Sequence, residues 1–121
     1  MPAAMNCAQA RDTARHVLAE HHAPEALVAD VLTVVSELVS NAIRHGSGLT
    51  GFHITISSGH IVIEVSDRST LPPHLQPPSP QTPGGFGWRV VKTLAPGTFI
   101  RFHRTGKTIT STLPTNVSPA P

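Results

Sequence analysis

The sequence predicts an α/β (α+β) two-layer sandwich, in which helices cover one face of a mixed, largely antiparallel sheet. Two observations lead to this fold class. Several stretches have apolar residues at three-and-four spacing, and two pairs of alternating stretches have the pattern of β-hairpins. With 121 residues the chain can bury one hydrophobic core but not two. We therefore expect one domain at residues 8–113, preceded by a short extension at 1–7 and followed by a disordered, Pro-rich tail at 114–121.

The first part of the domain is expected to form two helices. Residues 8–22 are rich in Ala, Leu, Arg and Glu, which favour helix. A second helix is expected to follow Pro24, because proline suits a first helical turn, and to end at Gly46. Apolar residues recur along it at three-and-four spacing, so that it has one apolar face. This second helix is the most regular element of the sequence.

The middle of the chain is expected to contain a hairpin and a loop. Residues 52–57 and 61–66 alternate between apolar and polar side chains, and Ser58 and Gly59 between them predict a tight turn. Residues 71–83 hold most of the internal prolines and show no apolar period. We therefore expect a long, mobile loop there.

The last part of the domain is expected to contain a short helix and a second hairpin. Apolar residues after Gly87 have helical spacing, and Pro96 ends the pattern. Residues 98–104 and 107–113 then alternate about Gly106, as expected of two paired strands. The chain is therefore predicted to run helix, helix, strand, strand, loop, helix, strand, strand.

The composition excludes several classes of protein. The formal net charge is only +2, and the basic residues form no run or concentrated face, which argues against direct nucleic-acid binding. No apolar run approaches the roughly 18 residues of a membrane span, and the first residues lack the pattern of a secretory signal. A cytoplasmic location without membrane association is expected. Cys7 has no second cysteine to pair with, and the eight histidines do not show metal-ligand spacing.

Glu37 and Asn41 are the first candidate functional residues. They lie four positions apart on the second predicted helix, so their side chains share one face. The carboxamide oxygen of Asn suits Mg²⁺, and the carboxylate of Glu can position or deprotonate a nucleophile. The spacing alone leaves a second interpretation open, in which both residues form the solvated side of an amphipathic helix.

Two further signals concern phosphates and bases. Gly85 and Gly87 precede a predicted helix, where the backbone can approach phosphate oxygens and free N–H groups favour negative charge. Neither these glycines nor Gly106-Lys107-Thr108 complete a dinucleotide fingerprint or a P-loop. Asp67, at the end of a predicted strand, can accept a hydrogen bond from the exocyclic amine of a base. A simple turn-forming role fits Asp67 equally well.

Taken in order, these segments resemble the Bergerat-type ATPase fold, whose members include the sensor histidine kinases. The chain is most similar to the small anti-sigma-factor serine/threonine kinases of bacteria, over about Ala8 to Leu113. Four segments carry the resemblance: Val35 to Gly46 (VSELVSNAIRHG), Val65 to Asp67, Gly85 to Val91, and Gly106 to Thr108. The first is quite specific, and the others add weight through their order and spacing.

The resemblance implies a role for each matched residue. Glu37 corresponds to the general base that orients the attacking hydroxyl, and Asn41 to the Mg²⁺ ligand. Asp67 corresponds to the carboxylate that reads adenine. The loop at 71–83 corresponds to the lid over ATP. The remaining residues implied in ATP binding are His45, Gly85, Gly87 and Thr108, the last of them near the adenine.

The chain departs from the family pattern in two places. Ser69 and Leu71 stand where the pattern after Asp67 has glycines, which affects the adenine pocket and the hinge of the lid. The chain before the first helix is also very short, so a strand that many relatives have there is expected to be missing. An open sheet edge would then invite pairing with another chain, including a second copy in a homodimer.

The predicted function is that of an ATP-binding regulatory protein with ATP and Mg²⁺ as cofactors. By the resemblance, it binds a sigma factor and transfers the γ-phosphoryl group of ATP to a Ser or Thr of an anti-anti-sigma partner. The alternative is a non-enzymatic, partner-binding module with a degenerate nucleotide pocket, which Ser69 and Leu71 favour.

Overall fold

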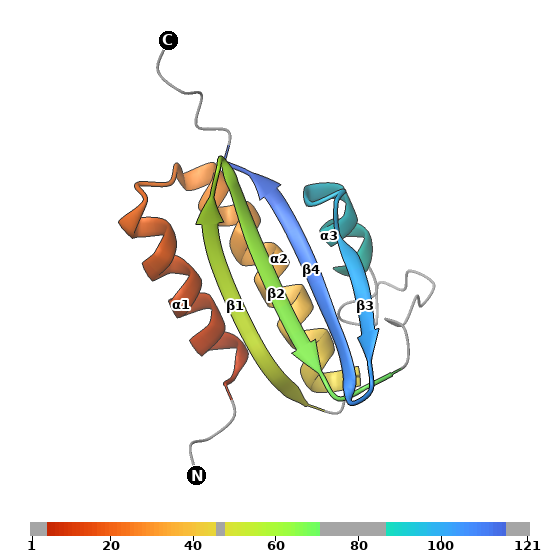
Figure 1. Ribbon diagram of the computed structural model, residues 1–121. Coiled ribbons are helices and arrows are strands. Elements are labelled where there is room, and N and C mark those ends of the chain that lie inside the picture. The colour runs from red at the N-terminus through yellow and green to blue at the C-terminus, as the bar shows by residue number, and fades with distance from the viewer. Residues whose placement is uncertain (1–4, 46–47, 71–86, 116–121) are drawn as a thin grey trace.

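A computed structural model, which describes residues 5–45, 48–70 and 87–115, has the predicted two-layer architecture (Figure 1). Four strands form one sheet in the order β1-β2-β4-β3, and each of their three described pairings is antiparallel. The helices lie together behind the sheet in the view of Figure 1. The elements are α1 (Cys7–Glu20), α2 (Glu25–His45), β1 (Leu49–Ser57), β2 (His60–Asp67), α3 (Gly87–Leu94), β3 (Phe99–His103) and β4 (Gly106–Pro114).

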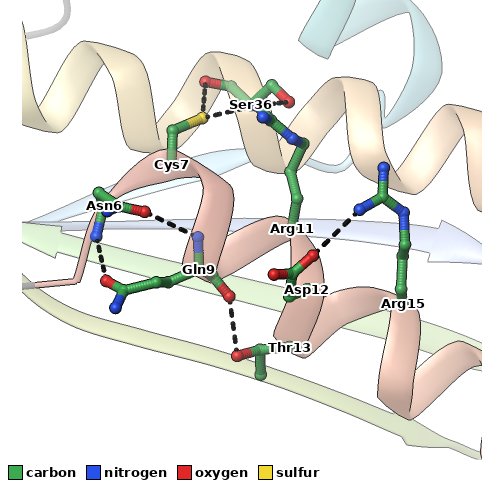
Figure 2. A network of polar contacts seen from close by, with 8 residues as sticks. All are labelled: Asn6, Cys7, Gln9, Arg11, Asp12, Thr13, Arg15 and Ser36. Atoms are coloured by element: carbon green, nitrogen blue, oxygen red, sulfur yellow. Dashed lines mark hydrogen bonds and ion pairs between the residues drawn. The ribbon is translucent and has the colours of Figure 1, made fainter.

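A capping box fixes the start of α1 (Figure 2). The side chain of Asn6 accepts a hydrogen bond from the backbone N–H of Gln9 at 2.8 Å, and the side chain of Gln9 accepts one from the backbone N–H of Asn6 at 2.9 Å. These bonds satisfy two backbone donors that would otherwise lack acceptors at a helix start. The helix therefore begins at Cys7, one residue before the predicted position.

Polar contacts join α1 to α2 (Figure 2). Arg11 donates from Nη1 to Cys7 Sγ at 3.2 Å and to Ser36 Oγ at 3.5 Å. The Cys7 thiol also lies 3.7 Å from Ser40 Oγ. Because Ser36 and Ser40 each precede a candidate site residue in the sequence, these contacts hold α1 on the flank of α2 beside the candidate site. Cys7 is half-buried, as expected of a small side chain at a helix contact.

Helix α2 supplies the centre of the core. It lies between α1 and α3 in the helical layer (Figure 1), and its apolar stripe faces the sheet. By length and composition it could cross a membrane, with a mean hydropathy of 1.6, but a buried core helix has the same composition. Its buried residues belong to one cluster with the inward side chains of β2 and β4. The buried residues of α2 are Leu27, Val31, Val34, Val35, Leu38, Val39 and Ala42.

The strands alternate as predicted, and the alternation decides which side chains face the helices. On β2 every second residue from Ile61 to Asp67 is buried. Ser58 and Gly59 form the predicted turn between β1 and β2, with φ values of 52° and 79°. Left-handed backbone at both positions matches the twist of a two-residue hairpin.

The two sheet edges are formed by β1 and β3. Within the described residues no strand precedes α1. Strand β4 extends through Pro114, one residue beyond the predicted end of the domain. The predicted loop at 71–83 lies outside the described residues, as do Gly46 and the tail after residue 115.

Candidate functional site

Glu37 and Asn41 occupy one face of α2, one turn apart. Both side chains are partly exposed, in contrast to the fully buried Leu38 between them. The predicted helical placement of both residues is therefore correct. Their carboxylate and carboxamide are close enough in sequence to act on one ligand.

The beginning of α3 lies directly against the Glu37 carboxylate. A Cβ atom added at Gly87, the first residue of α3, would overlap Glu37 Oε2 and would lie only 2.6 Å from Glu37 Cδ. Glycine is therefore required at position 87 for this approach. The contact brings together two residues that the sequence placed fifty positions apart.

This arrangement suits an anionic ligand that carries a metal ion. The first N–H groups of a helix have no acceptor within the helix, and the partial positive charge there favours phosphate. At the same place Glu37 offers a carboxylate, and Asn41 offers a hard carboxamide oxygen one turn further along α2. Residue Gly85, also predicted to contact phosphate, lies outside the described residues.

Asp67 ends β2 and is buried, with 3% of its surface exposed. Its side chain points to the helix-facing side of the sheet, on the same face as Val65. Oδ1 accepts a hydrogen bond from the backbone N–H of Ser69 at 2.8 Å. Lys107 Nζ lies 3.0 Å from Oδ1 and 3.0 Å from Oδ2 of the same carboxylate. Asp67 is therefore held in a buried ion pair.

Lys107 is a residue of the site that the sequence patterns did not identify. It is almost fully buried and lies directly opposite Asp67 in the β2–β4 register. The alternation of the two strands places Asp67 at the end of the buried side of β2 and Lys107 at the start of the buried side of β4. That alternation could have indicated Lys107 only together with the pairing register of the strands, which local patterns do not supply.

Thr108, predicted to lie near the base, points away from Asp67. It is paired with Ser66 in the sheet, and the two hydroxyl oxygens are 2.8 Å apart. His103 Nε2 lies 3.2 Å from the same Thr108 oxygen. Because successive side chains of a strand point to opposite faces, Thr108 and Ser66 occupy the face of the sheet opposite Asp67 and Lys107. The structure thus brings Lys107, rather than Thr108, to Asp67.

Several candidate residues belong to segments that meet at one end of the molecule. The end of β2, the start of β4 and the C-terminal end of α2 lie together there (Figure 1). His45 is the exposed last residue of α2. Among the described residues no group of three or more His, Cys, Asp or Glu side chains could hold a metal ion. A metal ion at this end would therefore need ligands from a nucleotide or water in addition to Asn41.

Comparison with known families agrees with this arrangement. Residues 2–113 match the histidine kinase-like ATPase domain, so the match extends over both helices of the N-terminal half and both hairpins. The chain belongs to the histidine kinase-like ATPase family. A search of the curated proteins finds no significant match. The Bergerat-type fold and the ATP-binding character expected from the sequence are thus confirmed.

The histidine kinase-like ATPase domain implies ATP, typically with Mg²⁺, and the described residues fit the two ends of ATP unequally. At the phosphate end, the close approach of Gly87 to Glu37 and the position of Asn41 fit a magnesium-bound phosphate chain. At the base end, the Asp67 carboxylate is present, but both of its oxygens contact Lys107. Asp67 therefore differs from an unpaired carboxylate, whose oxygens are free to accept a hydrogen bond from the amino group of a base.

Proposed function

We propose that this chain is an ATP-binding regulatory protein of the anti-sigma-factor type, which transfers the γ-phosphoryl group of ATP to a Ser or Thr of an anti-anti-sigma partner. The observation that supports this most strongly is the contact of the Glu37 carboxylate with Gly87 at the start of α3, one helical turn from Asn41. The contact supports the proposal, because a carboxylate that would act as the base lies at a helix start that would bind phosphate, and the proposed Mg²⁺ ligand is one turn away.

Each described residue has one task in the proposed transfer. Glu37 accepts the proton of the attacking hydroxyl as the oxygen bonds to the γ-phosphorus, and the bond from that phosphorus to ADP breaks. The backbone at Gly87 stabilises the charge on the phosphoryl oxygens. Asn41 would hold Mg²⁺, which neutralises phosphate charge when bound. The fixed position of α3 against α2 keeps these groups aligned.

Replacing Glu37 by Ala or Gln tests the assigned base. We expect Mg-ATP affinity to change by less than about threefold, because the phosphates do not depend on this carboxylate for binding. Phosphoryl transfer should fall by roughly 100-fold or more, the typical contribution of a positioned base. Calorimetric titration measures the first quantity, and transfer of labelled phosphate from ATP to purified anti-anti-sigma proteins of the source organism measures the second.

Glu64→Gln is the matched control for this test, because Glu64 lies on β2 at a half-buried position on the other face of the sheet. It should leave both quantities unchanged. Equal loss of binding and transfer in the Glu37 variants would contradict the role of Glu37 as a base.

A second candidate function is a non-enzymatic module that binds a partner. The ion pair between Asp67 and Lys107 favours it, because this pair alters the base end of the nucleotide site. Ser69, which stands where the family pattern has glycine, donates its backbone N–H to the same carboxylate. Titration of the folded protein with Mg-ATP separates the two functions, since the module predicts no binding at millimolar nucleotide.

A further inference from the structure

The buried pair of Asp67 and Lys107 carries an inference that rests on the proposed ATP site and adds to it. We propose that Lys107 is a specificity-determining residue, which removes the preference for adenine that the Asp67 carboxylate would otherwise give. The nucleotide site then accepts purine triphosphates with either an amino group or an oxygen at carbon 6 of the base.

Both oxygens of the Asp67 carboxylate are already occupied. Lys107 Nζ contacts both oxygens of Asp67 at 3.0 Å, and the N–H of Ser69 adds a third contact at Oδ1. The side chains of the pair are 3% and 5% exposed. An amino group of a base would therefore have to share oxygens that already accept hydrogen bonds, and it gains less from them than from an unpaired carboxylate.

The position of Lys107 in the sheet holds its side chain in place. Asp67 and Lys107 are directly paired residues of β2 and β4, the two central strands. Long, flexible lysines on a surface sample many positions, but this ammonium group is fixed by burial and by the strand register. The ammonium group is therefore a permanent part of the base end.

Purine bases differ in the groups that they present on the edge at carbon 6. Adenine presents an amino donor at carbon 6 beside an acceptor at N1, whereas guanine and hypoxanthine present an oxygen acceptor beside an N–H donor. A carboxylate alone favours the amine and repels the oxygen. A carboxylate whose oxygens are already paired with an ammonium group favours the amine less and repels the oxygen less, so it selects neither edge.

The affinities of the unmodified protein for Mg-ATP, Mg-GTP and Mg-ITP test the inference directly. We expect the dissociation constants to agree within about threefold, because no edge of the purine is selected. A preference for ATP above roughly 30-fold would overturn the inference. Calorimetric titration of the unmodified protein measures all three dissociation constants.

Lys107→Thr supplies the second test. Removing the ammonium group frees the Asp67 oxygens, so we expect the preference for ATP over GTP to rise to about tenfold or more. Lys92→Thr is the matched control, since Lys92 is an exposed lysine on α3 that donates to the Thr98 carbonyl oxygen at 3.2 Å. An unchanged ratio in folded Lys107→Thr would overturn the inference. Thermal unfolding checks the fold, and if that variant does not fold, the ratio in the unmodified protein decides.

The outcomes separate this inference from the proposed function. A strong ATP preference together with phosphoryl transfer overturns the inference and supports the function. Similar affinities without transfer support the inference and overturn the function. No binding of any nucleotide by the folded protein or by folded Lys107→Thr overturns both.

Discussion

Gly87 illustrates how one missing side chain shapes the candidate site. Its backbone approaches Glu37 so closely that a Cβ atom would overlap the carboxylate, the far end of a flexible side chain. An added methyl group would therefore displace the Glu37 carboxylate more readily than it would displace α3. Glycine at the first position of α3 lowers the stability of the helix, because glycine has a lower helix propensity than alanine.

Gly87→Ala should lower phosphoryl transfer while leaving the stability of the protein nearly unchanged. We expect the free energy of unfolding to change by less than about 1 kcal/mol, because the gain in helix propensity offsets the crowding at Glu37. Phosphoryl transfer should fall by roughly 10- to 100-fold, since the carboxylate leaves its position. Urea unfolding and transfer assays measure the two effects, with Thr93→Ala, at an exposed position on the same helix, as the control. A loss of several kcal/mol with normal specific activity would contradict this account.

At the residue scale, the sequence predicts the placement of Glu37 and Asn41 better than the surroundings of Asp67. Glu37 and Asn41 follow from spacing along one helix, which is local information. The environment of Asp67 depends on a residue 40 positions away, and only the strand register brings that residue into contact. The same register places Thr108 on the other face of the sheet, which no local pattern indicates.

Among the elements, the turn between β1 and β2 depends most clearly on a single backbone conformation. Ser58 and Gly59 both have positive φ, and beyond Gly59 and its two chain neighbours no atom lies within 4 Å of the position where a Cβ would be on Gly59. The requirement at Gly59 is therefore conformational and not steric. The turn sets the register that places the apolar residues of β2 toward the helices.

Gly59→Ala should destabilise the protein by about 1–2 kcal/mol, the cost of left-handed backbone for a residue with a Cβ atom. Gly97→Ala is the matched control, because that glycine also has open space around it and does not have positive φ. The control should be neutral or stabilising by up to about 1 kcal/mol. Urea unfolding of both variants measures the difference. Equal effects would show that conformation at Gly59 does not limit stability.

Elements with regular patterns were predicted closely. The second helix was correct to within one residue at each end, because its apolar period, proline and terminal glycine agree. Strand β1 was less accurate, since it begins at Leu49 and includes an irregular register between Leu49 and Gly51. The apolar alternation is interrupted at that irregularity, so the sequence pattern alone begins the strand at Phe52.

For the whole molecule, the order of elements predicted the class of fold but not the order of strands. Two consecutive hairpins can combine into one sheet with several different strand orders. In the observed order, β1-β2-β4-β3, β4 lies beside β2. The pairing of β2 with β4 is long-range and depends on packing against α2. Sequence patterns describe each hairpin separately and do not contain that information.

The central β2–β4 pairing also determines when the candidate site forms during folding. Its partners are separated by a long segment of chain, so the entropy of closing that segment must be overcome before the contacts compensate for it. The base end of the site should therefore be absent from the folding transition state. Bound Mg-ATP should then slow unfolding and leave the refolding rate nearly unchanged, which stopped-flow kinetics with and without the nucleotide would measure. A nucleotide that accelerates refolding would mean that the two central strands pair early.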